Sequence, residues 1–331
     1  MMPASFILRR GRERGVAVIT ALLLTTLAVA IVASLFWQQQ VQVRSMENQR
    51  LHLQTKWILR GALDWSTLVL DTFRTQYTSL DQAWATPLAE TRLDQYIERE
   101  RVQGENFDAT LSGNVTDACS RYNLRNLADT NGVNTGQVEL FQNLLRNLQL
   151  QYTLADKVAD YVAATRPPAA VPTDGSPPPG TRSSTVPGKP MSLLQVDDLL
   201  AVPGFTPEIV ERLRPFVTVL PEAKTPVNVN TAAPELLAAV LKNASVSEAN
   251  TWVAQRKQAP WRDVANFMTA AGNGRVAVAD DAIGVKSDWF FVNSRIRLDR
   301  AALDAEALIH RASAGPLSPG GGTRVVWIRQ D

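Results

Sequence analysis

Residues 16–36 read VAVITALLLTTLAVAIVASLF, and this run contains no charged residue. Arg14 is the last charge before the run and Arg44 is the first charge after it. As a helix with a rise of about 1.5 Å per residue, about 20 apolar residues span the ~30 Å hydrocarbon core of a membrane. Hydroxyl residues inside the run can bond to carbonyls of their own helix, so they do not argue against a span. The run therefore predicts one membrane-spanning helix over residues 16–37.

The charges on either side of this run predict its orientation. The head before it contains the cluster Arg9, Arg10, Arg12 and Arg14, whereas the stretch after it, WQQQVQVRSMENQR, is nearly neutral. Basic flanks remain in the cytoplasm. We therefore expect a cytoplasmic head and a large body on the other side of the membrane, with Trp37 as an interfacial anchor.

The junction between head and run is unusual for a secretory signal. A signal peptide is cut after its apolar region, at a site of small residues. Here the A-x-A match, residues 28–30, lies inside the run, while the basic head ends in Arg14-Gly15 directly before Val16. An uncleaved signal anchor is the alternative that the residues leave open, and the charge asymmetry disfavours a buried core helix. The arrangement favours a cut before the helix, so that the helix stays in the mature protein.

This junction resembles the class III leader of type IV pilins and type II secretion pseudopilins. The resemblance implies that residues 1–15 are a leader, that prepilin peptidase cuts between Gly15 and Val16, and that the new terminus is N-methylated. The stretch RGVAVITALLLTTLAVAIVASLFWQQQVQVRSMENQR, residues 14–50, is similar to the start of the K-type minor pseudopilins.

One position departs from the general pilin pattern. Most pilins and pseudopilins carry glutamate at the fifth mature position, where this chain has Thr20. In the family's filament models that glutamate meets the amino terminus of the subunit above, and a charge buried in an apolar bundle needs such a partner. In a subunit at the tip, a glutamate at this position would have no amino terminus above it to pair with. Thr20 therefore indicates a tip subunit, and the K-type family shares this loss.

The next part of the chain predicts a longer helix followed by strands. Residues 38–85 contain spaced apolar positions and no proline, which indicates that the helix continues out of the membrane. Residues 86–124 are expected to supply the first strands. Within them, 105–124 predict a hairpin or two short strands with a turn at 112–114. The phrase SRYNLRNL, residues 120–127, is similar to a K-type motif, with Arg125 in place of an asparagine.

A helical insertion is predicted over residues 125–285. Helical patterns occupy 137–163 and 191–270. Thr206 and Pro207 are expected to cap and start one helix, and Pro234 another, with Asn230 or Thr231 as its N-cap.

Strand patterns return in residues 286–331: WFFVNSRIRLD, ALDAEALIHRAS and TRVVWIRQD, the last two separated by the turn PGGGT. The resemblance implies an α+β fold. Its parts are a long N-terminal transmembrane helix, a pilin-like antiparallel sheet, and a helix-hairpin-helix or SAM-like insertion between strands.

The insertion contains a loop dense in proline, glycine and serine, residues 166–190. Many K-type relatives carry an acidic calcium-associated motif in the matching region. Here only Asp174 remains among prolines, and calcium needs several converging oxygen ligands. No metal site and no cofactor is therefore predicted for this chain.

The residue inventory argues against an enzyme. The only cysteine is Cys119 and the only histidines are His52 and His310, too few for a zinc site built on Cys and His. A nucleophilic pair of Cys119 with either histidine lacks an activating environment, and a buried structural cysteine is the better interpretation. Serine-hydrolase, metal-ligand and phosphate-loop motifs are missing as well. The acidic pairs 197–198 and 280–281 are better interpreted as turn or cap residues.

Helix-hairpin-helix units also occur in DNA-binding proteins, so a membrane-tethered periplasmic DNA-uptake protein is the alternative function. A phosphate-binding surface is basic. Residues 191–270 instead hold eight acidic side chains (Asp197, Asp198, Glu208, Glu211, Glu222, Glu235, Glu248, Asp263) and seven basic ones (Arg212, Arg214, Lys224, Lys242, Arg256, Lys257, Arg262). This balance disfavours nucleic acid as a partner.

The resemblance implies a non-enzymatic, single-pass protein of the bacterial inner membrane, with its N-terminus in the cytoplasm and its body in the periplasm. It implies a place at the tip of the type II secretion pseudopilus, where the subunit helps to start assembly and protein export across the outer membrane. The implied partners are the I-, J- and H-type minor pseudopilins, the major pseudopilin, prepilin peptidase and the assembly platform. The secretin and exported proteins are further implied partners.

Overall fold

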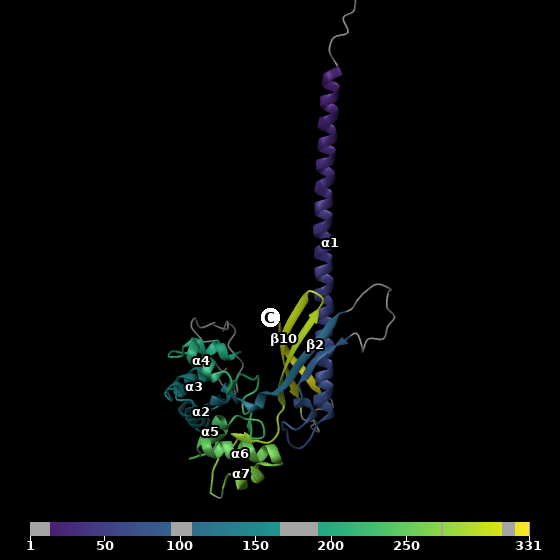
Figure 1. Cartoon of the computed structure of the whole chain (residues 1–331). Helices are drawn as coiled ribbons and strands as arrows, with labels where there is room; N and C mark the ends of the chain where they lie inside the picture. Colours follow the sequence, from purple (N-terminus) through teal and green to yellow (C-terminus); the bar gives the residue numbers. More distant parts are fainter. Residues whose placement is uncertain (1–13, 94–107, 166–190, 273, 313–321, 331) are drawn as a thin grey trace, which may run out of the picture.

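A single long helix dominates the shape of the molecule (Figure 1). The computed structural model describes residues 14–93, 108–165, 191–272, 274–312 and 322–330. Helix α1, Arg14–Thr72, has 59 residues and is therefore about 90 Å long. Its first part projects free of the body, and its last part lies along the sheet.

The sheet has five antiparallel strands in the order β1-β2-β9-β10-β11. The strands are β1 Leu88–Arg92, β2 Ala109–Asp117, β9 Trp289–Leu298, β10 Ala301–Arg311 and β11 Thr323–Gln330. Strand β2 pairs with β9, although everything between residues 117 and 289 separates them in the chain. This confirms the predicted α+β fold with a helical insertion between strands.

The apolar core of the sheet lies under the second part of α1. Leu59, Leu63 and Leu70 of α1 are buried against β9 and β10, where Phe290 and Ile309 are fully buried. Trp84, in the short 3₁₀ helix η1 (Ala83–Ala85), closes this core and meets Phe290 edge-on at 5.2 Å between ring centroids. Each such apolar side chain contributes roughly 1.5–3 kcal/mol by its burial.

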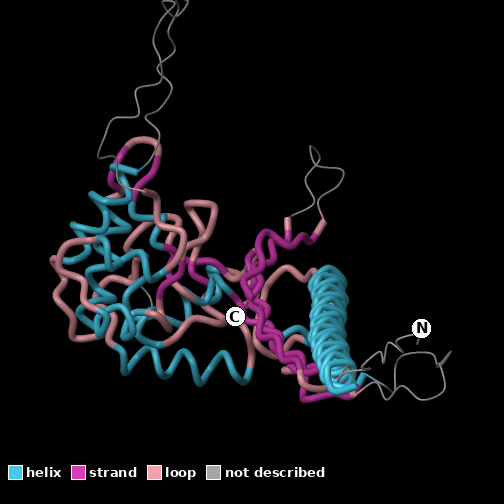
Figure 2. The backbone as a smooth tube through the Cα atoms, turned by 90° about the horizontal axis from the view of Figure 1, so that it is seen from above, coloured by secondary structure: helices cyan, strands magenta, loops and turns pink. Residues whose placement is uncertain are grey.

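The inserted domain lies on the other side of the sheet from α1, so that the sheet stands between them (Figure 2). Its helices are α2 Thr135–Asn147, α3 Leu154–Thr165, η5 Val196–Ala201, α4 Pro207–Leu213, α5 Pro234–Val240, α6 Val246–Gln258 and α7 Val264–Ala271. Two further 3₁₀ turns precede them, η3 Ala118–Ser120 and η4 Leu124–Leu127. Three two-stranded pairs tie the domain together: β3 Tyr122–Asn123 with β6 Val217–Thr218, β4 Ala128–Asp129 with β5 Gly132–Val133, and β7 Val227–Asn228 with β8 Ile283–Gly284.

Local capping explains where several of these helices begin. The Thr206 side chain accepts the backbone N–H of Ile209 and Pro207 occupies the first turn of α4, as predicted. Ser245 forms a capping box with Glu248 at the start of α6. For α5 the prediction is half right. Pro234 starts the helix, but the N-cap is Ala233 and not Asn230 or Thr231.

Two predictions about the first 124 residues were wrong. The helix expected to continue to residue 85 ends at Thr72. Arg311, at the end of β10, points its guanidinium at carbonyls around this end. Its Nη1 donates to the carbonyls of Leu70 and Phe73, each at 3.4 Å, which satisfies groups that a longer helix would use itself.

The expected turn at 112–114 is the second error, because β2 runs through it without a break. The glycine there serves close strand approach: a Cβ on Gly113 would lie 2.4 Å from the carbonyl oxygen of Asn293 on β9. The predicted leader up to residue 13, the loop 166–190 and most of the PGGGT turn lie outside the described residues.

Candidate functional site

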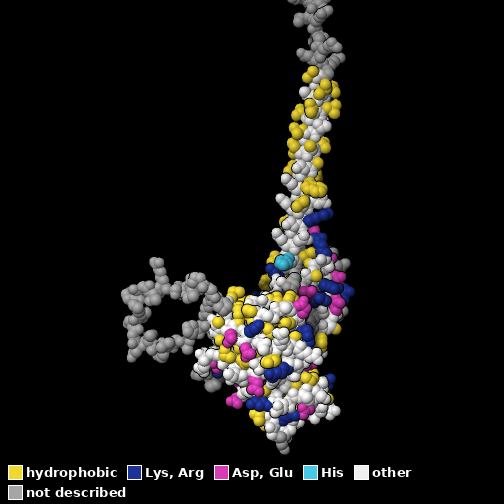
Figure 3. All heavy atoms as spheres, turned by 90° about the vertical axis from the view of Figure 1, so that its left-hand side faces the viewer, with side chains coloured by type: hydrophobic (Ala, Val, Ile, Leu, Met, Phe, Trp, Pro, Cys, Tyr) yellow, Lys and Arg dark blue, Asp and Glu magenta, His cyan; other side chains and the backbone are white. Residues whose placement is uncertain are grey.

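The first part of α1 is an apolar surface without any cover from its own chain. Every described side chain from 16 to 50 is exposed, including Val16 at 65%. Figure 3 shows this column of hydrophobic side chains above the body. Among the described residues, α1 is the one helix long and apolar enough to cross a membrane, with a mean hydropathy of 2.7 in its most apolar window. Such a surface needs lipid or other apolar helices around it.

The predicted processing and filament-core residues lie at the start of this surface. Gly15 and Val16 are in the first turn of α1. The hydroxyl of Thr20 donates to the carbonyl oxygens of Val16 and Ala17, each at 3.0 Å. Thr20 is therefore neutral and satisfied inside its own helix, and it needs no partner from a neighbouring chain.

A buried polar cluster joins the helical domain to the sheet. Its centre is the carboxylate of Asp117 at the end of β2. Oδ1 accepts the backbone N–H of Cys119 at 2.8 Å. Oδ2 accepts Nδ2 of Asn228 at 2.9 Å and the hydroxyls of Thr231 and Ser287 at 2.5 and 2.6 Å. These donors come from the insertion and from the segment before β9, so one carboxylate holds three separate stretches of chain. We call this group the joint cluster.

Thr78, in the loop after α1, and Arg311 extend the joint cluster to the long helix. The backbone oxygen of Thr78 accepts Nδ2 of Asn228 at 3.0 Å. Nη2 of Arg311 donates to the Thr78 hydroxyl at 3.0 Å and to the carbonyl of Ser287 at 2.6 Å. The end of α1, the sheet and the insertion are therefore linked through groups that exclude water.

Burial controls the ionisation of this region. Burial raises the pKa of Asp117 above its ordinary value, while hydrogen bonds from Ser287, Thr231, Cys119 and Asn228 act in the opposite direction. Burial, and next the Asp117 charge, raise the pKa of the Cys119 thiol well above its ordinary value. Cys119 is therefore a buried thiol and not a nucleophile, as predicted.

The other candidate groups have structural roles. His310 stacks on Trp289 at 4.2 Å between ring centroids. Within the described residues, no three His, Cys, Asp or Glu side chains gather in a way that holds a metal. Asp198 caps η5 by accepting the backbone N–H of its N-cap residue, Gln195, at 3.0 Å, and the carboxylate of Asp281 accepts a hydrogen bond from Nε2 of Gln137 at 2.9 Å.

The basic side chains of the first hairpin are occupied within the protein. Arg214 of the η5–α4 unit pairs with Asp197 at 2.6 Å and with Glu211 at 2.7 Å. Arg212 donates to the carbonyl of Leu148. Phosphate binding would need such groups to be available, so this hairpin does not support the DNA-uptake alternative.

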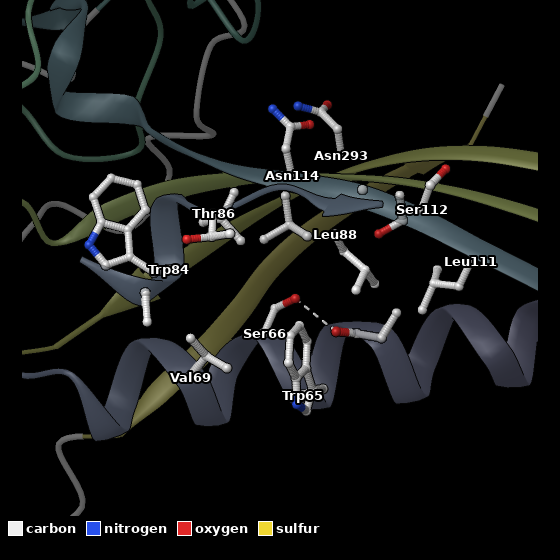
Figure 4. A pocket seen from close by; sticks show the side chains of 16 residues that line it. Trp65, Ser66, Val69, Trp84, Thr86, Leu88, Leu111, Ser112, Asn114 and Asn293 are labelled. Atoms are coloured by element: carbon white, nitrogen blue, oxygen red, sulfur yellow. Dashed lines mark hydrogen bonds between the residues drawn. The ribbon is translucent and has the colours of Figure 1, made fainter. Parts of the chain in front are cut away.

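A small pocket between α1 and the first strands is too small for a substrate (Figure 4). Trp65, Ser66 and Val69 of α1 face Leu88 and Leu111 across it. Its volume of about 50 Å³ holds no more than a few water molecules. The Ser66 hydroxyl is used within the helix, where it donates to the carbonyl of Ala62 at 2.8 Å.

The SRYNLRNL phrase, singled out in the sequence, holds a loop of the insertion. Nδ2 of Asn123 donates to the carbonyl of Glu222 at 2.6 Å, and its Oδ1 accepts the backbone N–H of Leu220 at 3.1 Å. Nδ2 of Asn126 donates to the carbonyl of Thr225 at 2.8 Å. Both asparagines are buried, so their side chains satisfy backbone groups of residues 220–225 that water does not reach.

Comparison with known proteins agrees with this geometry. Two models of the family described as type II secretion system, protein K, match residues 120–222 and 227–286. The type II secretion system protein K of Pseudomonas aeruginosa is 30% identical over 255 residues, which cover 71% of this chain and 70% of that protein. This chain belongs to the type II secretion system protein K family. The protein K of Pectobacterium carotovorum is 25% identical and covers 91% of this chain and 93% of its own length.

The fold of protein K is also found among solved structures. The crystal structure of the GspK-GspI-GspJ complex from the enterotoxigenic Escherichia coli type 2 secretion system contains a chain that matches with a TM-score of 0.63. The match has 18% identity and covers 86% of this chain and 99% of that chain. This chain is thus a minor pseudopilin of a type II secretion system, a structural protein and not an enzyme.

Sequence reasoning missed the joint cluster. Asp117, Asn228, Ser287 and Arg311 are spread over about 200 residues, and none belongs to a motif. The one local signal is Asn228, a polar residue between the two valines of VNVN, where β7 begins.

Proposed function

We propose that this protein occupies the tip of a type II secretion pseudopilus and helps to start its assembly. The observation that carries the proposal is the state of Thr20, whose hydroxyl is satisfied by its own helix. A subunit below the tip offers a charged group at this position to the subunit above, whereas this chain offers none. Helix α1 can therefore pack against subunits below it in the filament core, and no buried carboxylate is left without a partner above.

The inserted domain supports the same proposal. It is set between β2 and β9 and joined to the sheet and α1 through the joint cluster. A bulky domain held rigidly beside the sheet hinders another subunit from stacking above. The role is structural and involves no bond chemistry. Helix α1 packs into the apolar core of the filament. The body prevents another subunit from adding above it and is the surface onto which the first subunits below assemble.

Processing and placement belong to the proposal. Prepilin peptidase cuts between Gly15 and Val16, and α1 then holds the chain in the inner membrane with its body in the periplasm. The partners are the I-, J- and H-type minor pseudopilins, the major pseudopilin, the assembly platform, and the secretin and exported proteins. Nucleic acid is not an expected partner, and no metal or cofactor is assigned to the described residues. The mass of the N-terminus, with and without the peptidase, tests the cut: loss of residues 1–15 with a methylated Val16 is expected, and an intact Met1 under both conditions contradicts it.

Replacing Thr20 tests the tip role. Thr20→Glu places a carboxylate in the apolar core with no partner above it, so we expect secretion and the number of pseudopili per cell to fall at least tenfold. Thr20→Val, which keeps the shape without the hydroxyl, is the matched control and is expected to secrete normally. Normal secretion by Thr20→Glu would contradict the proposal.

A further inference from the structure

A groove between α1 and the edge strand β11 is left open by the fold. It has a volume of about 800 Å³. On the helix side it is lined by Leu53, Trp57 and Arg60, and on the strand side by Val326 and Ile328. Trp57 is 71% exposed and Ile328 is 45% exposed. Both are large apolar side chains that the chain itself does not cover, and exposed apolar surface of this kind marks an interaction site.

The width of the sheet explains the groove. Five strands spaced about 4.8 Å apart make a face roughly 20 Å wide, whereas one helix with its side chains covers about 10–12 Å. Ile328 pairs across the ladder with Ala307, whose side chain is buried under α1, so Ile328 lies on the same face. This face therefore has room for a second helix beside α1.

The edge strand favours a helix over an added strand as the occupant. Leu308 pairs with Trp327, but the next residue, Ile309, pairs with Val325, so Val326 is an extra residue that bulges from the ladder. A bulge interrupts regular pairing and protects an edge against further strands. The opening also lies over the face of the sheet and beside α1, where helices pack.

Charge defines the partner further. Lys56 and Arg60, one helical turn apart, line the groove, and neither forms a hydrogen bond or an ion pair with any described residue. Among the described residues that line the groove, Asp64 is the one acid. A helix with an apolar face and carboxylates four residues apart would complement this surface.

A second copy of this chain does not fit. Its own α1 would bring Arg44 and the same two cations toward Lys56 and Arg60. This part of α1 carries three acids. Glu47 already pairs with Arg300 at 3.1 Å and Asp71 with Arg74 at 2.5 Å, which leaves Asp64 alone to face these cations. Like charges therefore oppose self-association through this groove.

We infer that the groove between α1 and β11 binds an amphipathic helix of a different, membrane-anchored subunit, through its apolar face and carboxylates that pair with Lys56 and Arg60. This inference rests on the proposed assembly into a filament, because only there does a second helix leave the membrane beside α1. Beyond the proposed function, it assigns the binding of that helix to the α1–β11 groove and its selection to Lys56 and Arg60.

Photocrosslinking in the full-length chain, expressed with its secretion system, tests the inference. A benzoylphenylalanine at position 57 is expected to capture a heterologous subunit, with the captured peptide mapping to an acidic amphipathic helix. The matched control is the same group at position 65, an exposed tryptophan on the same helix that lines the small pocket instead. We expect at least tenfold less of this adduct at position 65.

Charge reversal makes the test specific. Lys56→Glu with Arg60→Glu is expected to lower the adduct about tenfold, the loss that about 1.4 kcal/mol of binding represents. Lys242→Glu with Lys257→Glu, an equal change on the exposed surface of the helical domain, is expected to leave it unchanged. Lysines in place of the carboxylates on the captured helix are expected to restore the adduct to the reversed groove.

Four results would overturn the inference: an adduct with a second copy, an adduct with an extended segment, an adduct insensitive to charge reversal, or no adduct at position 57 in secreting cells. Each is separable from failure of the proposed function. Cleavage after Gly15 and secretion by the Thr20 variants, measured in the same strains, report on the tip role whatever the groove binds.

Discussion

The two parts of α1 are one continuous helix with opposite relations to the rest of the molecule. Residues 16–36 are apolar all around and touch nothing in their own chain, whereas Leu59, Leu63 and Leu70 farther along are buried in the core of the sheet. Apolar side chains on one helix therefore serve two purposes. In the second part they stabilise the body, and in the first they leave a surface that only a membrane or other helices can cover.

The largest difference between the two parts is expected when leucine is replaced by alanine in each of them. Leu63 is 2% exposed, so Leu63→Ala is expected to lower the free energy of unfolding of the body by about 2–5 kcal/mol. Leu24→Ala, on the uncovered part, is expected to leave it unchanged. Denaturant unfolding of the detergent-solubilised chain, followed by tryptophan fluorescence, measures both. Equal effects of the two changes would mean that the parts do not differ as described.

The joint cluster, which fixes the end of the packed part, gives the next largest effect. Asp117→Ala removes the acceptor of four hydrogen bonds and leaves buried donors unpaired, so a loss of about 3 kcal/mol is expected. The control is Asp304→Ala, which removes an exposed ion pair to Arg295 on the same sheet and should cost less than ~1 kcal/mol. Hydrogen exchange should also rise at the ends of β2 and β7 in the first variant. A loss no larger than that of the control would contradict the role of the cluster.

The raised pKa of Asp117 gives this cluster a pH signature. The folded state holds the Asp117 proton more tightly than the unfolded chain does. The contribution of Asp117 to stability is therefore fully present below its ordinary pKa of 3.8, and it declines as the pH rises through the raised pKa. Asp117→Asn does not titrate, so the native chain should lose stability relative to this variant as the pH rises. A difference that is constant, or that changes in the other direction, would contradict the direction of the shift.

These residues also show what the sequence can and cannot predict. The apolar run, the Thr206–Pro207 helix start and the alternation in β9 are local patterns, and the structure confirms all three. The prediction for the end of α1 was wrong, and the carbonyls there bond to Arg311, which is more than 200 residues away and belongs to no local pattern. The mid-strand Gly113 was misread as a turn, because its reason is the backbone of β9 and not its own neighbours. The joint cluster was not predicted from the sequence either, because its residues are far apart in the chain and come together only in the folded protein.

The ion pair between Asp197 and Arg214 is expected to contribute less to stability than the buried carboxylate of Asp117. Hydrogen bonding and charge from Arg214 lower the pKa of Asp197, whose side chain is 44% exposed. Asp197→Asn should therefore cost well under ~1 kcal/mol at neutral pH. The contribution of the native pair is present above the ordinary pKa of 3.8 and disappears as the pH falls through the lowered one, so both chains should converge in acid. Thermal unfolding at pH 7 and pH 2.5 measures this, and a gap that widens in acid would contradict it.

The most direct test of the tip role is to locate the inserted domain on assembled pseudopili. Lys257 is exposed and the native Cys119 is buried, so Lys257→Cys offers a single reactive thiol for a gold label. If this chain occupies the tip, the label is expected at one end of each pseudopilus and not along its length. Label spaced regularly along the shaft would contradict it, because subunits would then stack above this chain.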